Sequence, residues 1–154
     1  MSEGRKPLVV AMCASVSFYQ QIMEVKAKLE AKGLVGLAPD LAEVMAKRND
    51  YAIESYYDEP GGDEFIDKKS GAIRSHFDKI AKADAVLVIN LEKHGNRAYI
   101  GPNVLMEVGL GFYLDKPIFV WRRIAEDDRF REEILAMKPV WVDEKVEKVV
   151  EVLS

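Results

Sequence analysis

One carboxyl group stands alone in a strongly apolar stretch of the sequence. Residues 98–114, AYIGPNVLMEVGLGFYL, hold a single charged side chain, that of Glu107. Pro102 and Asn103 are typical of a helix start, with Asn103 as the capping residue, and this places Glu107 in the first or second turn. The helix dipole favours an ionised carboxylate there, whereas burial favours the neutral acid. This balance is typical of nucleophilic or acid–base catalysis, and the alternative is a glutamate that points outward to solvent.

Few other residues in the chain have catalytic potential. His76 lies in a helical pattern beside Phe77, and a histidine in such a place is more often packed or solvated than catalytic, whereas His94 sits in a turn. Cys13 ends an apolar run, where the role of a small hydrophobic residue is favoured over that of a nucleophile. Because no His, Asp or Glu residues have convincing ligand spacing, we expect no metal site and no cofactor. The Gly-x-Ser-x-Gly pattern of serine hydrolases is absent from the sequence.

The elements that must position these residues follow a regular alternation. Apolar runs of strand length occur at 8–13, 34–38, 85–89, 117–121 and 140–142, and helical spacing occurs at 20–32, 72–83, from 103 onward, within 122–137 and at 143–153. Such alternation predicts a doubly wound α/β fold of the flavodoxin or Rossmann type, with a five-stranded parallel sheet and helices on both faces.

Length and composition favour a single domain that binds a small molecule. The 154 residues suit one domain spanning 1–154, with an irregular insertion around 39–70 that contains one helix near 41–47 and serves as a lid or as surface decoration. With 22 basic and 26 acidic residues, the chain offers no basic face for a nucleic-acid polymer. One cysteine and the lack of a signal peptide or membrane span lead us to expect a cytoplasmic protein without a membrane partner.

In an open parallel sheet, ligands bind beyond the carboxyl ends of the strands. Residues 12–18, MCASVSF, follow the first strand, and there the hydroxyls of Ser15 and Ser17, next to Phe18, can hold an anion. The alternative is a serine-rich turn that only caps a helix. Neither Gly-x-Gly-x-x-Gly nor a phosphate-loop Gly-Lys-Ser/Thr pattern is present. After the third strand, Asn90 and Tyr99 can make polar and stacking contacts to a base or sugar; residues 121–124 follow the fourth strand.

Three motifs together indicate a family resemblance. The segments MCASVSF, ADAVLVIN and YIGPNVLMEVGLGFYLDKPIFVW resemble the nucleoside 2-deoxyribosyltransferase-like family, which includes deoxynucleotide N-glycosidases. The most specific part is the helical glutamate followed by Val-Gly-Leu-Gly and then Asp-Lys-Pro-Ile-Phe. The resemblance implies that Glu107 is a nucleophile that attacks the anomeric carbon of a ribosyl or deoxyribosyl group and forms a glycosyl-enzyme intermediate.

The sequence departs from the family pattern at three positions, as expected of a divergent branch. His76 stands eight residues before Asp84, where family members commonly have a carboxylate that engages the base. Gly101 replaces an acidic or hydroxyl residue, and Ala11 replaces a tyrosine of the nucleotide-cleaving members. The resemblance therefore implies altered catalysis, in which His76 protonates a leaving base or activates water.

Three hypotheses of function follow. The first is cleavage or transfer of the N-glycosidic bond of a nucleoside or nucleotide, with Glu107 and His76 as catalytic residues. In it, the substrate is bound by Ser15, Ser17, Phe18, Asn90, Tyr99, Gly101 and Asn103. The second is a non-catalytic nucleotide-binding module that retains the cleft. The third is an assembly protein that uses the YYDEP segment and the final valine-rich helix, and in every case we expect at least a homodimer.

Overall fold

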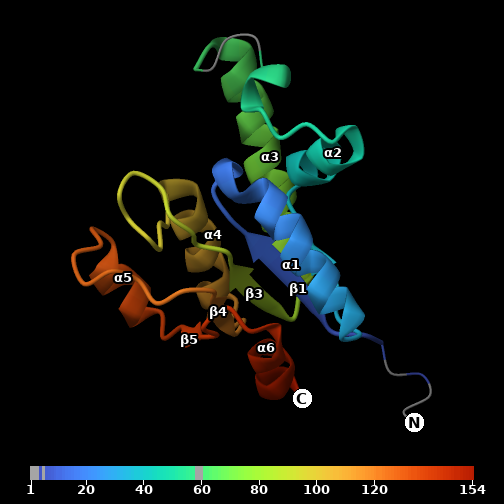
Figure 1. The fold of residues 1–154 in the computed structure, drawn as a ribbon, viewed down its shortest axis with the longest axis vertical. Helices are drawn as coiled ribbons and strands as arrows, with labels where there is room; N and C mark the ends of the chain where they lie inside the picture. Colours follow the sequence, from blue (N-terminus) through green and yellow to red (C-terminus); the bar gives the residue numbers. More distant parts are fainter. Residues whose placement is uncertain (1–3, 5, 58–60) are drawn as a thin grey trace.

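The fold is a parallel sheet with helices on both faces (Figure 1). The computed structural model describes residue 4 and residues 6–57 and 61–154. The strands pair in the order β2-β1-β3-β4-β5, and every pair is parallel. Their bounds are β1 Val9–Cys13, β2 Val35–Leu37, β3 Ala85–Val88, β4 Ile118–Val120 and β5 Val140–Trp141. The predicted doubly wound α/β fold with five parallel strands is confirmed.

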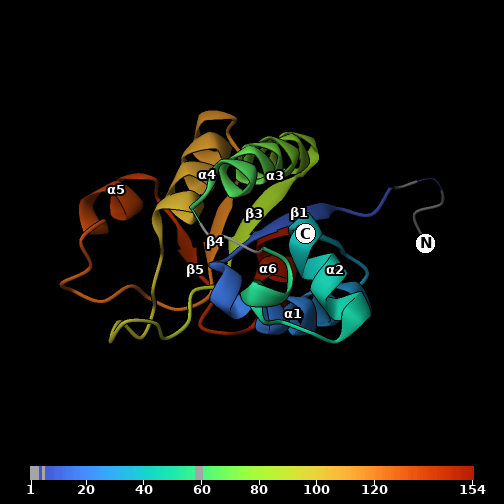
Figure 2. The same ribbon diagram turned by 90° about the horizontal axis from the view of Figure 1, so that it is seen from above.

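The helices form two layers around the sheet. Their bounds are α1 Tyr19–Ala31, α2 Asp40–Arg48, α3 Asp63–Lys82, α4 Pro102–Tyr113, α5 Arg131–Ala136 and α6 Val146–Leu153, with 3-10 turns η1 Val16–Phe18 and η2 Ile53–Ser55. Figure 2 shows α3 and α4 side by side on one face of the sheet, and α1 and α6 on the other. Among the described residues, no helix combines the length and apolar character that crossing a bilayer requires.

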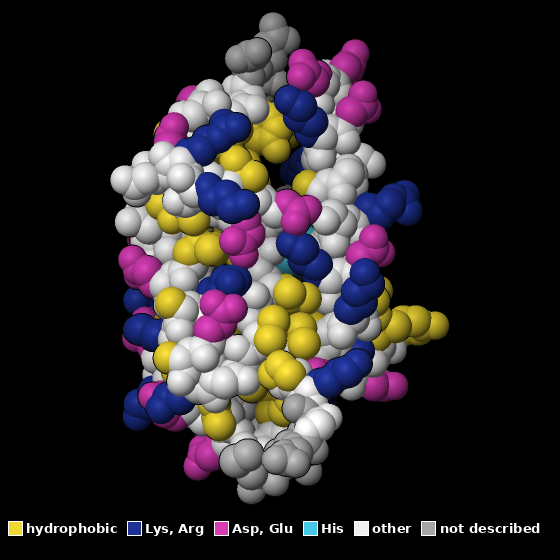
Figure 3. All heavy atoms as spheres, turned by 90° about the vertical axis from the view of Figure 1, so that its right-hand side faces the viewer, with side chains coloured by type: hydrophobic (Ala, Val, Ile, Leu, Met, Phe, Trp, Pro, Cys, Tyr) yellow, Lys and Arg dark blue, Asp and Glu magenta, His cyan; other side chains and the backbone are white. Residues whose placement is uncertain are grey.

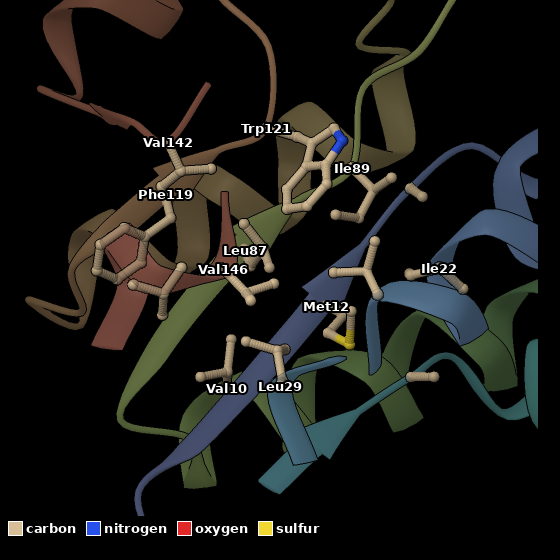
Figure 4. Packing of buried hydrophobic residues seen from close by; sticks show 14 of the residues in the cluster. Val10, Met12, Ile22, Leu29, Leu87, Ile89, Phe119, Trp121, Val142 and Val146 are labelled. Carbon is tan, nitrogen blue, oxygen red and sulfur yellow. The ribbon is translucent and has the colours of Figure 1, made fainter. Parts of the chain in front are cut away.

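Alternate residues of the strands face opposite layers. Met12, Leu87 and Trp121 belong to the cluster that packs on α1 and α6, part of which is seen in Figure 4. Cys13 and Val88 belong to the other cluster, which packs on α3 and α4. The last residue of β1 therefore points toward the two helices that carry the candidate catalytic residues.

Two helix starts differ from the prediction. Helix α3 begins at Asp63 and not near residue 72, so part of the segment 39–70 is regular: it holds α2, η2 and the first turns of α3. Acidic residues in the first turn and lysines in the last turn of α3 match its dipole, which supports a helix despite the polar sequence. Helix α4 is capped by Gly101, and Pro102 takes its first position. The prediction that Asn103 is the cap is wrong, because Asn103 lies inside the first turn.

Candidate active site

Three elements bring Cys13, His76 and Glu107 together. Cys13 is the last residue of β1. His76 lies on the buried side of α3, one turn before the fully buried Ile80. Glu107 lies in the second turn of α4, in register with Gly111, whose α-carbon packs against the sheet. The side-chain ligand atoms of Cys13, His76 and Glu107 all lie within 4.8 Å of one another, and the Cys13 Sγ atom is 3.5 Å from His76 Nε2.

The cluster lies at the ligand-binding edge expected of this fold. The strand order places β2 on one side of β1 and β3 on the other, so the direction of strand addition reverses between β1 and β3. Cys13 pairs with Val88 at the carboxyl end of these two strands. Open α/β sheets bind ligands at this switch point because loops and helix N-termini converge there.

A cavity of about 200 Å³ opens beside Glu107. Its walls come from η1 and α1, the start of α2, the segment after α2, and helices α3 and α4. The residues that line it are mostly apolar or aromatic: Val16, Tyr19, Pro39, Asp40, Leu41, Ile53, Tyr57, Phe65, Lys69, Ala72, Ile73, His76, Asn103 and Glu107. Figure 3 shows a hollow on the face that carries α2, with hydrophobic side chains on its walls and charged side chains around it. The volume is below the roughly 300–1,000 Å³ of pockets for drug-sized ligands, which indicates a small ligand or part of one.

Burial tunes the carboxyl group of Glu107. Loss of solvent raises the pKa of Glu107 from 4.5 to about 7, and the hydrogen bond from the Cys13 thiol opposes this rise only in part. The carboxyl group is therefore close to half ionised at neutral pH. A carboxylate in this state is less well solvated than one at the surface and is more reactive as a nucleophile or base.

Three neighbours of Glu107, the side chains of Cys13, Tyr19 and His76, are uncharged at neutral pH. Burial lowers the pKa of His76 to about 4, so that its ring is a neutral imidazole. Burial and the nearby Glu107 raise the pKa of the Cys13 thiol and of the Tyr19 hydroxyl, so both keep their protons. Within this group, Glu107 is thus the side chain whose charge changes near pH 7.

A polar network fixes one wall of the cavity. Asp40 accepts hydrogen bonds from Ser75 Oγ at 2.6 Å and from Lys79 Nζ at 2.7 Å. Lys79 Nζ also donates to the Ala38 carbonyl at 2.6 Å. These bonds to Lys79 and Ser75 hold the pKa of Asp40 below its usual value. They tie α3 to the start of α2 and so keep His76 in place against β1.

Three of the residues predicted for the site share this cavity: His76, Asn103 and Glu107. Asn103 and Glu107 are four residues apart on α4, so they lie on the same side of the helix. Gly101 caps this helix, and the Tyr99 ring lies over it: a β-carbon at Gly101 would come within 3.0 Å of the Tyr99 hydroxyl. Tyr99 itself faces a neighbouring hollow with His94 and Arg97.

The other predicted residues lie elsewhere. Ser15 Oγ accepts a hydrogen bond from Lys93 Nζ at 2.9 Å. Ser17 and Phe18 border a hollow next to Trp121, and the Phe18 ring is part of the core beneath it. Asn90 is completely buried; its Nδ2 donates to the carbonyls of Ala98 and Arg122, and its Oδ1 accepts from the Arg122 N–H. These bonds give Asn90 a structural role in joining two loops.

Several residues in or beside the cavity were not foreseen from the sequence. Cys13 was interpreted as a small hydrophobic residue, yet its thiol contacts both catalytic candidates. Strand alternation is the feature that could have indicated this position, because residues 11 and 13 lie on the same face of the strand and point toward the same helices. Asp40 is the first residue of α2 and comes three residues after the end of β2, at the edge where ligands bind. Tyr19 and Tyr57 reach the cavity from segments whose path the sequence pattern does not reveal.

Comparison with known proteins gives a structural likeness but no match in sequence to a family or to a curated protein. No model of a protein family matches the chain, and no curated protein matches it. Among solved structures, the chain is similar to a 2-deoxyribosyltransferase from the psychrotolerant bacterium Bacillus psychrosaccharolyticus, with a TM-score of 0.59 and 14% sequence identity. The match covers 92% of this chain and 89% of that one. The two proteins therefore share a fold over nearly their whole length.

Proposed function

We propose that the protein cleaves or transfers the N-glycosidic bond of a nucleoside or nucleotide, with Glu107 as the nucleophile. The observation that carries this proposal is a single carboxyl group with a pKa of about 7 on the wall of a mostly apolar cavity, at the ligand-binding edge of the sheet. The shared fold with a 2-deoxyribosyltransferase supports the class of substrate. The sequence motif around Glu107 supports the same role.

The reaction has two steps. In the first, a Glu107 carboxylate oxygen bonds to the anomeric carbon while the bond from that carbon to the base nitrogen breaks. The electron pair of the broken bond stays on the base, which takes a proton from water at the cavity mouth. In the second step, the oxygen of a water molecule or a nitrogen of an acceptor base bonds to the anomeric carbon while the bond to Glu107 breaks, so that the pentose leaves with its original configuration. The proton lost by the incoming water or base neutralises the hydroxide that the first step leaves in solvent.

His76 suits the second step better than the first. Because the pKa of His76 is lowered to about 4, its ring carries no proton to give at neutral pH but has a free electron pair to accept one. Its ligand atom lies within 4.8 Å of that of Glu107, which is close enough to act on a water molecule attacking the same carbon. We assign His76 as the base that activates the incoming water, a role that requires its ring to turn, because Nε2 lies 3.5 Å from the Cys13 thiol sulfur and Nδ1 is buried without a hydrogen-bond partner.

The cavity offers contacts for both parts of a nucleoside. Asn103 stands one turn before Glu107 on α4, where its amide can bind a sugar hydroxyl. Tyr57 and Phe65 form an edge-to-face pair with ring centroids 4.8 Å apart, and these rings line the same cavity. Aromatic surfaces of this kind are suited to contact a flat base. The Ser15–Ser17 turn remains a prediction for phosphate binding.

Release of free base from a panel of nucleosides and nucleotides tests the proposal. Wild-type protein is expected to release base from at least one substrate, and Glu107→Gln to lose that activity by at least about a thousandfold, as for other catalytic nucleophiles. Glu132→Gln changes an exposed glutamate on α5 and is the matched control, with activity equal to the wild type. Activity should rise as Glu107 ionises near pH 7. Equal release by wild type and Glu107→Gln would exclude Glu107 as the nucleophile.

One observation favours a second candidate function, non-catalytic nucleotide binding. Asp40 is the other carboxylate on the cavity wall, and its oxygens already accept bonds from Ser75 and Lys79. The described cavity therefore offers one carboxyl group that is available for chemistry, where retaining glycosidases use two. A nucleotide that raises the melting temperature but is recovered intact after prolonged incubation would support this candidate over the first.

A further inference from the structure

Cys13, His76 and Glu107 supply three different ligand atoms to one point. We propose that these three side chains form a binding site for a zinc ion, with the fourth coordination position open to the cavity. This inference goes beyond the proposed function and does not depend on it. It also revises the expectation from sequence that the chain has no metal site.

The ligand set and spacing fit zinc. Zinc in proteins is bound by cysteine sulfur at about 2.3 Å, histidine nitrogen at about 2.0–2.1 Å and carboxylate oxygen at about 2.0–2.2 Å, usually in tetrahedral geometry. Tetrahedral angles with these bond lengths require a sulfur–nitrogen separation of about 3.6 Å. The separation between Cys13 Sγ and His76 Nε2 is 3.5 Å, and the third ligand atom lies within 4.8 Å of both. Tetrahedral zinc requires the Glu107 oxygen to lie about 3.4–3.6 Å from the other two ligand atoms, so the Glu107 side chain would have to rotate toward them when the metal binds.

Charge balance favours a divalent ion in this buried place. Cys13 is completely buried and His76 is 4% exposed, so an unbalanced charge among them is strongly unfavourable. A thiolate and a carboxylate together neutralise the two positive charges of zinc. Binding releases the thiol proton of Cys13, and that of Glu107 where it is protonated, to solvent. Of the lysines on α3, Lys79 is already paired with Asp40 and the Ala38 carbonyl, whereas Lys69 lines the same cavity.

The three ligands are held by regular elements of the fold. The Cys13 carbonyl accepts a hydrogen bond from the Ile89 N–H at 2.8 Å, which fixes the end of β1 beside β3. Metal sites built on strands and helices hold their ligands more rigidly than sites built on loops. His76 and Glu107 both line the cavity, so the fourth position faces the open space. Three protein ligands and one open position are the arrangement of catalytic zinc sites.

Metal binding and nucleophilic attack would use the same carboxylate oxygens of Glu107, so the two exclude each other. A carboxylate bound to zinc shares an oxygen electron pair with the metal, and its negative charge is balanced, so it is a poor nucleophile. We therefore expect added zinc to suppress release of base by the active protein and a chelator to restore it. This readout depends on the proposed function, whereas metal binding itself is measured without any substrate.

Cobalt absorption spectroscopy tests the site directly. Co²⁺ takes the place of zinc and gives a thiolate-to-cobalt charge-transfer band, and Cys13 is the only cysteine of the chain. Reduced protein without a histidine tag is titrated with Co²⁺ and then with Zn²⁺. We expect a band that saturates at one equivalent, intense visible bands typical of tetrahedral cobalt, and loss of both when Zn²⁺ is added. A chain that shows no charge-transfer band would overturn the proposal.

Variants of the three residues distinguish the loss of a metal ligand from a general loss of folding. Cys13→Ser should abolish the charge-transfer band, and His76→Ala and Glu107→Gln should each weaken binding by at least about tenfold. His94→Ala, in an exposed turn, is the control and should bind as the wild type does. Glu107→Gln keeps the shape of the side chain, so its loss of binding does not arise from misfolding, and circular dichroism verifies this. Unchanged binding in both His76→Ala and Glu107→Gln contradicts the proposed ligand set.

Failure of this inference and failure of the proposed function are distinguishable. Saturable cobalt binding without release of base from any nucleoside supports the metal site and counts against the N-glycosidic activity. Release of base that requires Glu107, together with no cobalt band, overturns the metal site alone.

Discussion

Replacing Glu107 by glutamine should stabilise the protein in a pH-dependent way. In the folded state, burial raises the pKa of Glu107 from 4.5 to about 7. The folded protein therefore holds the proton more tightly than the unfolded chain does. Stability contributed by this group is complete below pH 4.5 and is lost as the pH rises through 7. Glutamine is neutral at every pH, so Glu107→Gln removes this loss.

The size of the effect follows from the pKa values. At about 1.36 kcal/mol per pKa unit, a rise from 4.5 to about 7 corresponds to about 3 kcal/mol. Between pH 5 and pH 8, about 2.5 kcal/mol of this difference should appear as an increasing advantage of the variant over the wild type. His76 acts in the opposite direction because its pKa is lowered, but it is present in both proteins and cancels in the comparison.

Urea unfolding at pH 5 and pH 8 measures this difference. Both proteins are compared at one concentration and in the presence of a chelator, so that neither assembly nor metal binding alters the result. The exposed Glu132→Gln variant should follow the wild type at both pH values. If the free energies of unfolding of wild type and Glu107→Gln change in parallel with pH, Glu107 is not a partly buried carboxyl group with a raised pKa, and the reasoning behind the site fails.

Three further predictions concern the frame of the site. A β-carbon at Gly111 would lie 2.8 Å from Val86 Cγ2, whereas a β-carbon at Gly109 would meet open space. Gly111→Ala should therefore lower the free energy of unfolding by about 1–2 kcal/mol, and Gly109→Ala should raise it by about 0.5–1 kcal/mol. Equal effects of the two variants in urea unfolding would contradict the close packing of α4 on the sheet. Asn90→Ala should cost about 3 kcal/mol in stability but leave the KM of the folded protein unchanged, and a raised KM without loss of stability would instead support substrate contact. Light scattering should show at least a dimer, which Phe112→Glu on the exposed face of α4 should weaken, and a monomeric wild type would refute the expectation.

The fold was predictable because the strands are buried on both faces. Near-continuous apolar runs such as Ala85–Val88 are distinct from the charged helices between them. The alternation of such strands with helices predicts a parallel sheet that is covered on both faces. Glu107 was predictable for a related reason: it is the single charged side chain of a nearly all-apolar helix, although α4 leaves Met106, Phe112 and Tyr113 exposed. The position of this helix after the third strand then placed Glu107 at the binding edge.

The partners of Glu107 were harder to predict because they depend on contacts between distant segments. Cys13, His76 and Glu107 come from one strand and two helices. The local spacing of residues does not predict that these three side chains lie close together. Asn90 was expected to contact a ligand, yet its amide is used to join backbone groups of two loops. Polar residues at strand ends serve both purposes, and the sequence pattern is the same for each. The start of α3 was missed because its first turns are polar and exposed.

Detection of a covalent intermediate on Glu107 tests the central claim most directly. The protein is incubated with a nucleoside from which it releases base, in the form of a 2′-fluoro analogue that slows the second step, and is quenched in acid and digested. We predict that the peptide containing Glu107 gains the mass of one 2-fluoropentosyl group and that Glu107→Gln shows no such gain. Release of base with no adduct on this peptide, or with an adduct on another residue, would contradict the account.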